Sequence, residues 1–183
     1  MASFHHSIFF LLAVTAVVTA LALTAAAAAA ADMTHLHFYM HDTLSGRNAT
    51  TVRVVEGPAA LADSNFGDLY VIDDPLTDGP APTSMLVGRA QGFYLLDSIE
   101  GSGVLVSANL GFTANGPHNG STIAVYGSYA DDQPEKELSV VGGSRKFRLA
   151  RGYVLIKTYS FNATTGDSIL ELDAYITTNK WLR

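Results

Sequence analysis

The chain has 183 residues, with 17 acidic and 11 basic side chains and a formal net charge of −6. An acidic chain lacks the basic stripe that contacts phosphates, which argues against nucleic acid as its main partner. It contains no cysteine, which excludes thiol nucleophiles, cysteine-ligated zinc and disulfide bonds.

The first 31 residues carry no Asp, Glu, Lys or Arg. Residues 8–23 are apolar and residues 24–31 are small, which predicts a secretory signal peptide over 1–31 with cleavage near Ala31. The alternative is an uncleaved membrane anchor, because the uncharged stretch from Ile8 to Ala31 is long enough to span a bilayer. The remaining residues, 32–183, are expected to form a single domain.

The mature chain is predicted to be all β. Residues 34–42 alternate strictly, with Leu36, Phe38 and Met40 on one face and histidines and a tyrosine on the other, the two-residue period of a half-buried strand. Further strands are expected over residues 52–55, 69–72, 85–96, 103–113, 121–127, 138–141, 148–159 and 169–178.

Turn residues separate these segments, and Asp73, Asp74 and Pro75 are expected to end the third strand. The pair Gly142-Gly143 predicts a kink or bulge. Eight or nine short strands indicate an antiparallel sandwich or a closed barrel. A barrel is favoured, since about eight strands can enclose one small ligand.

Three sequons, at Asn48, Asn119 and Asn162, lie beside turn-forming residues. Behind a signal peptide they predict an exported glycoprotein that is released to the extracellular space.

His35, His37 and His41 share one strand face, and a His-x-His pair is a common metal ligand set. No glutamate follows at a useful spacing, so we interpret them as solvated strand histidines and predict no metal site. Nor does the chain contain a Ser-His-Asp order, a nucleophile elbow or a phosphate loop, and no cofactor is expected.

The charged residues leave two interpretations open. Asp42 and Asp74 could be turn residues, or one of them could pair with an arginine inside the barrel to bind an anionic or phenolic oxygen. The basic residues that crowd into positions 145–151 could supply that arginine, or they could all lie on the outer surface. The segment 131–137 is expected to be a solvated loop.

Seven short motifs, in order, resemble the plant dirigent family over about residues 34–178. They are His37-Phe-Tyr-Met-His41-Asp42, Phe66-Gly-Asp68, Val71-Ile-Asp73-Asp74-Pro-Leu-Thr77, Gly88-Arg-Ala-Gln-Gly-Phe-Tyr94, Asn119-Gly-Ser-Thr-Ile, Val140-Val-Gly-Gly143 and Ala150-Arg-Gly152. The resemblance implies an eight-stranded antiparallel barrel like that of allene oxide cyclase, a homo-oligomer (dimer or trimer), and secretion to the apoplast.

The resemblance also implies a role in phenylpropanoid chemistry. Dirigent proteins direct the stereoselective coupling of phenoxy radicals, such as those of coniferyl alcohol, in lignan biosynthesis. A separate oxidase, a laccase or peroxidase, makes the radicals, and the dirigent protein has no oxidative activity of its own. Two alternatives stay open: a cyclase or isomerase acting on quinone methide intermediates, and a non-catalytic defence protein that binds cell-wall phenolics or carbohydrate.

The same resemblance suggests site residues. Asp42 matches an acidic position that steers ring closure, and Arg151 matches a pocket arginine that would hold a phenolic or methoxy oxygen. Asp74 and Tyr94 fall in family motifs and are expected to line the same pocket. The segment 142–147 departs from the lignan-forming pattern, because Arg145-Lys146 stands where an aspartate is usual. A second pocket carboxylate must then be absent or come from elsewhere.

Overall fold

The computed structural model describes residues 33–61, 63, 65–113, 116–118 and 120–178. The predicted signal peptide and the sequon asparagine Asn119 lie outside these residues. Within them, no helix is long and apolar enough to cross a membrane.

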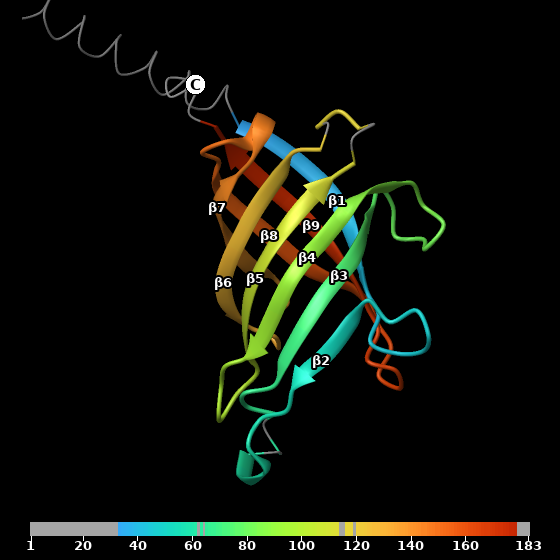
Figure 1. Cartoon of the computed structure of the whole chain (residues 1–183), viewed down its shortest axis with the longest axis vertical. Helices are drawn as coiled ribbons and strands as arrows, with labels where there is room; N and C mark the ends of the chain where they lie inside the picture. The colour runs from blue at the N-terminus through green and yellow to red at the C-terminus, as the bar shows by residue number, and fades with distance from the viewer. Residues whose placement is uncertain (1–32, 62, 64, 114–115, 119, 179–183) are drawn as a thin grey trace, which may run out of the picture. The chain divides into compact units, whose positions relative to one another are not determined.

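The described residues form nine strands and two short 3₁₀ turns (Figure 1). The strands are β1 (Met33–Asp42), β2 (Thr51–Val55), β3 (Leu69–Thr77), β4 (Leu86–Leu96), β5 (Gly103–Phe112), β6 (Thr122–Ala130), β7 (Lys136–Gly143), β8 (Arg151–Phe161) and β9 (Ser168–Thr177). The 3₁₀ turns are η1 (Ala59–Leu61) and η2 (Arg145–Phe147). The prediction of an all-β chain is confirmed.

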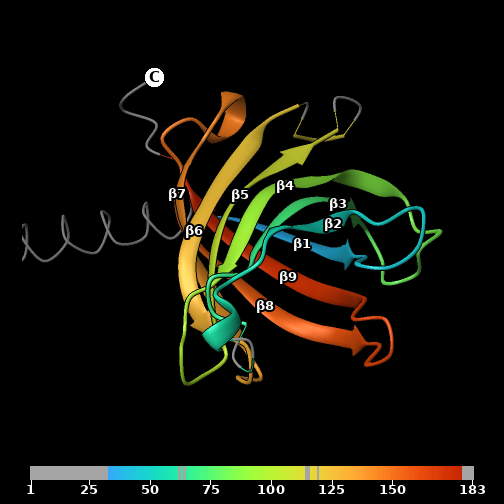
Figure 2. The ribbon, with the colours of Figure 1, turned by 60° about the horizontal axis from the view of Figure 1, so that its bottom comes forward.

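Eight of the strands close into an antiparallel barrel. Strands β3 to β9 pair in chain order, and β1 lies between β9 and β3, where its pairing with β3 closes the barrel. Figure 2 shows β8 and β9 as the wall facing β4 and β5. The eight-stranded barrel expected from the sequence is therefore confirmed, and β2 is a ninth strand attached to β3.

Strands β1 and β2 share one edge of β3. Tyr39 and Met40 of β1 pair with the end of β3, and β2 pairs with its beginning, Leu69 to Ile72. The two strands thus follow one another along β3, separated by the loop 43–50. We call this edge of β3, with the residues of β1 and β2 paired to it, the seam.

The prediction that Asp73, Asp74 and Pro75 end β3 after Ile72 was wrong, because the strand continues through Pro75 to Thr77. Proline has no backbone N–H to donate, and it is tolerated in strands where a neighbouring strand is missing. Pro75 lies between the stretch of β3 paired with β2 and the stretch paired with β1, so the seam provides such a place.

Alternation decides which side chains enter the barrel. On β1 the predicted pattern is confirmed: Phe38 is buried, whereas His35 and His37 are exposed on the outer face. These two histidines lie 2.7 and 3.0 Å from a carboxylate oxygen of Asp173 on β9. The outward histidines are therefore used in contacts between neighbouring strands.

The predicted kink at Gly142-Gly143 is confirmed as a bulge. Val125 of β6 pairs with Val140, whereas Ala124 pairs with Gly142, so Val141 is an extra residue. A Cβ on Gly143 would come within 2.5 Å of the carbonyl oxygens of Thr122 and Phe147. Only glycine fits this close approach, and the chain then turns through η2.

Candidate functional site

The barrel encloses a cavity of about 440 Å³, lined by residues from all eight of its strands. Its walls are mainly aliphatic side chains that point inward by strand alternation, among them Ile72, Val106, Leu110, Leu138 and Ile156. The volume lies in the range of small-molecule sites, and apolar walls of this kind suit flat aromatic rings.

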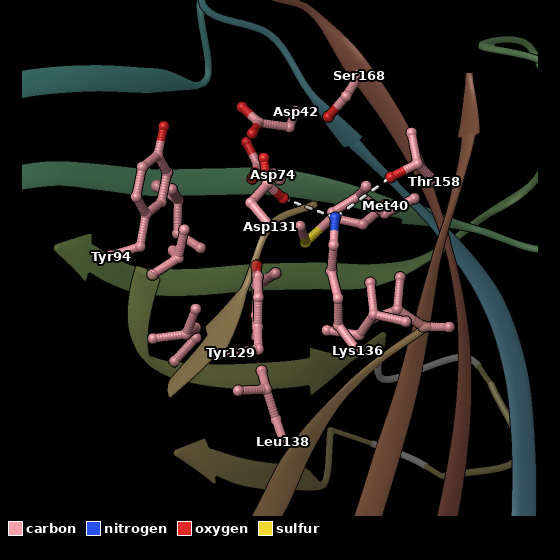
Figure 3. Close-up of a pocket in the computed structure, with 18 of the residues that line it drawn as sticks. Met40, Asp42, Asp74, Tyr94, Tyr129, Asp131, Lys136, Leu138, Thr158 and Ser168 are labelled. Carbon is pink, nitrogen blue, oxygen red and sulfur yellow. Dashed lines mark hydrogen bonds and ion pairs between the residues drawn. The ribbon is translucent and has the colours of Figure 1, made fainter. Parts of the chain in front are cut away.

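Polar side chains gather at one end of this cavity. In Figure 3 the carboxyl groups of Asp42 and Asp74 lie close together, and the polar ends of Tyr94, Tyr129 and Lys136 point toward the same end. The cavity therefore has an apolar body and one polar end. Such a distribution fixes the direction in which a ligand with polar and apolar parts can bind.

Asp42 and Asp74 meet because of the seam. Asp42 is the last residue of β1, and Asp74 lies on β3 between the stretches paired with β1 and β2. Asp74 is completely buried, and the Thr51 hydroxyl donates a hydrogen bond of 3.2 Å to its Oδ1. Among the described residues, Asp74 Oδ2 and Asp42 Oδ1 are buried without a hydrogen-bond partner. A carboxylate oxygen without a partner is unfavourable in such a place, which favours the protonated form of the group.

Burial and the proximity of Asp42 raise the pKa of Asp74 to about 7. Burial also raises the pKa of Asp42, although the Thr51 hydroxyl opposes this effect. Two carboxyl groups in a low-dielectric site do not both ionise readily, so Asp74 keeps its proton up to about neutral pH. One member can then donate a proton while the other accepts one.

Two tyrosines line the cavity beside this pair. Tyr94 stacks on Tyr70 with a ring-centroid distance of 4.7 Å. Burial is the main effect that raises the pKa of Tyr94, and the charge of Asp42 raises it further. Burial likewise raises the pKa of Tyr129, and the charge of Asp131 adds to this effect. Both phenols therefore stay neutral and can donate hydrogen bonds to a bound oxygen.

Lys136 is a buried cation at the same end of the cavity. It is the first residue of β7, is 6% exposed, and lies 2.6 Å from Asp131 Oδ1. It also contacts the Thr158 hydroxyl at 3.4 Å and lies over the Tyr129 ring at 5.6 Å. The described residues thus bring both an acid pair and an ammonium group to one apolar cavity.

The family model for dirigent-like proteins matches residues 33–177 of this chain, which is essentially the whole barrel. The chain belongs to the dirigent family. Dirigent protein 21 of Arabidopsis thaliana is 44% identical over 79% of this chain and 76% of the relative. Pterocarpan synthase 1 of Glycine max is 38% identical over 93% of this chain and 92% of the relative.

Solved dirigent structures share the barrel. A pterocarpan synthase dirigent protein superimposes with a TM-score of 0.75 and 40% identity, over 81% of this chain and 86% of that one. The similarity therefore extends over the strands that line the cavity, which are the same strands that hold Asp42, Asp74 and Tyr94.

Three of the four dirigent site residues suggested by the sequence meet in the cavity: Asp42, Asp74 and Tyr94. Arg151 is exposed at the start of β8 and is not among the described residues that line the cavity. Its Nη1 donates hydrogen bonds of 2.7 Å to the carbonyl oxygens of Val141 and Ala150. The inward positions of β8 have even numbers, such as Val154 and Ile156, so Arg151 lies on the outer side.

Lys136 was missed because the sequence interpretation assigned residues 131–137 to a solvated loop, which is wrong for the last two of these residues. The inward residues of β7 are Lys136, Leu138 and Val140. Counting back two positions from Leu138 would have placed Lys136 inside the barrel. Of the sequon asparagines, Asn48 and Asn162 are exposed in turns.

Proposed function

We propose that this dirigent protein holds a phenolic phenylpropanoid intermediate inside the barrel and directs its stereoselective ring closure. The Asp42–Asp74 pair is the observation that carries the proposal. Two neighbouring carboxyl groups lie at the polar end of an otherwise apolar cavity, and one of them, Asp74, keeps its proton up to about neutral pH. This arrangement suits general acid–base work on a neutral aromatic ligand.

The step is the closure of a quinone methide by a hydroxyl group of the same molecule. The hydroxyl oxygen bonds to the methide carbon, the ring becomes aromatic, and the ring carbonyl oxygen becomes a phenol. The hydroxyl loses one proton and the carbonyl oxygen gains one, so no oxidant is consumed. An ionised carboxyl group of the pair would accept the proton of the attacking hydroxyl, and the ring oxygen would gain its proton from a neighbouring donor or from water.

Two comparisons support this step. Pterocarpan synthases of Glycine max and Glycyrrhiza echinata are 38% and 41% identical to this chain. The solved dirigent structure with a TM-score of 0.75 is also a pterocarpan synthase. Ring closure as an activity in its own right is therefore the first function to test.

Stereoselective coupling of phenoxy radicals is the second candidate, and the relatives named dirigent proteins favour it. A laccase or peroxidase would supply the radicals of a monolignol such as coniferyl alcohol. The protein would orient them without any redox group, because radical combination needs positioning and little chemical assistance. The coupled product is a quinone methide, so the acid pair would then act on it as described above.

Two assays separate the candidates. In the first, a quinone methide is generated from a precursor without oxidant; in the second, coniferyl alcohol is treated with a one-electron oxidant. Both products are analysed by chiral chromatography. Ring closure predicts enantiomeric excess in the first assay, and radical coupling predicts it in the second. A racemic product in both assays at saturating protein would refute the proposed function.

Substitutions of the two carboxyl groups test whether they carry out the ring closure. Asp42→Asn and Asp74→Asn are expected to slow ring closure by about 100-fold, the usual contribution of a positioned acid or base. The matched control is Asp132→Asn, which changes an exposed loop carboxylate. Equal rates in all three variants would show that the pair has no part in the reaction.

We also propose that the protein works outside the cell as a glycosylated homo-oligomer. The leader and the exposed Asn48 and Asn162 support export. Neighbouring outward residues Val52, Val71 and Phe93 on β2, β3 and β4 are each at least 40% exposed, and such an apolar row suits contact with a second copy. Light scattering and intact mass spectrometry of the secreted protein would test both points.

A further inference from the structure

We propose that Lys136 is the anchor for the phenolic oxygen of the ligand, so that the cavity selects ligands whose ring oxygen carries negative charge or acquires it during reaction. This inference rests on the proposed phenolic ligand, but it concerns a different group from the acid pair. It assigns the ring oxygen and the attacking hydroxyl of the reacting molecule to two separate protein groups.

The position of Lys136 in the strand is unusual for a lysine. The alternate residues Lys136, Leu138 and Val140 of β7 point into the barrel. The residue opposite Lys136 on β8 is Ile156, which also lines the cavity. An inward position in a barrel with mainly aliphatic walls normally holds an aliphatic residue, because burying an ammonium group is unfavourable.

The contacts of Lys136 leave it able to bind a ligand. Its Nζ is 2.6 Å from Asp131 Oδ1 and 3.4 Å from the Thr158 hydroxyl (Figure 3). An ammonium group has three hydrogens to donate, and the contact with Thr158 is long. The side chain of Asp131 is 61% exposed, so water weakens its hold on the lysine.

Stability alone does not account for this ion pair. Replacing a buried ion pair by apolar groups of similar size is often neutral or stabilising. Here only the lysine is buried, and its aliphatic stem would pack as well if it ended in a methyl group. Packing alone therefore does not explain the charge of Lys136, and binding of a charged ligand oxygen would.

The proposed reaction supplies such an oxygen. When a nucleophile attacks the methide carbon, electrons move through the ring onto the carbonyl oxygen, which becomes a phenolate. A fixed ammonium group beside that oxygen stabilises the charge as it forms. The neighbouring Tyr129 phenol can donate to the same oxygen, which would leave the acid pair to manage the proton of the attacking hydroxyl.

A binding experiment tests the anchor independently of catalysis. The probes are 4-nitrophenol, titrated through its ionisation, and its uncharged methyl ether 4-nitroanisole. We expect the native protein to bind the nitrophenolate more tightly than the ether by about tenfold or more, the usual effect of a charge-assisted hydrogen bond.

Substitutions separate charge from packing. Lys136→Met keeps the length of the side chain and is expected to remove the preference for the phenolate while ether binding stays the same. Lys136→Arg is expected to retain the preference. Asp131→Asn removes the competing carboxylate and is expected to tighten phenolate binding, which a purely structural lysine would not produce. The control is Lys157→Met, which removes an exposed lysine paired with Glu135 on the outer surface.

A phenolate preference that persists in Lys136→Met overturns the anchor, and so does a native protein that binds neither probe. If Lys136→Met loses the preference but no ring closure is found with the native protein, the anchor stands and the proposed function fails. Circular dichroism of each variant confirms that the barrel is intact when binding is compared.

Discussion

The buried carboxyl group of Asp74 is expected to make the barrel less stable as the pH rises. Burial and the nearby Asp42 raise its pKa from 3.8 to about 7. In the unfolded chain the group loses its proton near pH 4, whereas in the folded barrel it keeps the proton until about pH 7. The stability that this group contributes is thus fully present below pH 4 and is lost as the pH rises to about 7.

The size of the effect follows from the shift of about three pKa units. Each unit corresponds to about 1.4 kcal/mol, so the folded state should lose about 4 kcal/mol between pH 4 and pH 8 through this one group. A typical domain is stable by only about 5–15 kcal/mol, so the loss is easily measured. Asp74→Asn replaces the carboxyl group by a neutral amide of the same shape and should remove most of this dependence.

The assay is guanidinium chloride unfolding of the native protein and Asp74→Asn from pH 4 to pH 8, followed by circular dichroism. One protein concentration is used throughout, so that self-association contributes equally. The two free energies of unfolding should be similar near pH 4 and should diverge toward pH 8, where the variant is more stable. Curves that stay parallel over the whole range would refute the argument that Asp74 is buried with a raised pKa.

Three further predictions concern the cavity. Asp42→Asn should lower the pKa of Asp74 by removing its acidic neighbour, which carbon NMR of the Asp74 carboxyl would detect; an unchanged pKa would show that the two groups do not interact. Ala108 of β5 lines the cavity, so Ala108→Phe places a ring in it and should weaken 4-nitrophenol binding by at least about tenfold, with the barrel spectrum retained; undiminished affinity would place the ligand elsewhere. Arg151→Ala should leave 4-nitrophenol binding within about twofold, because the guanidinium binds carbonyl groups on the outer side; a large loss would show that Arg151 reaches the ligand.

The fold was predictable because strand alternation is a local property. The alternation of β1 is visible in the sequence and fixes which face enters the barrel. The end of β3 was not predictable from local signals, since Asp73, Asp74 and Pro75 are typical of turns. They remain in a strand because β4 pairs with all three of them, and Pro75 is tolerated because β1 and β2 leave the other edge of β3 partly unpaired. Both are long-range features.

The candidate site was only partly predictable for a similar reason. Asp42, Asp74 and Tyr94 lie in family motifs, whereas Lys136 lies in a charged segment that resembles a solvated loop. The sequence also left open whether the basic residues at positions 145–151 face the cavity or the outer surface, because they do not lie on one continuous strand. The turn η2 separates β7 from β8 there, and Arg145 and Leu149 have positive φ angles of 50° and 60°. Side-chain directions cannot be transferred across such a break.

The seam also sets the local dynamics of the barrel. Along the described residues, β1 pairs with β3 only at Tyr39–Thr77 and Met40–Leu76, whereas β3 and β4 pair along nearly their whole length. A pairing as short as that between β1 and β3 can separate without unfolding the other strands. The amide hydrogens in this pairing should therefore exchange with solvent faster than those of β4 and β5. Each opening would let water reach Asp74. The acid pair thus lies at the seam, where a small local opening of the barrel is enough for its carboxyl groups to exchange protons with the solvent.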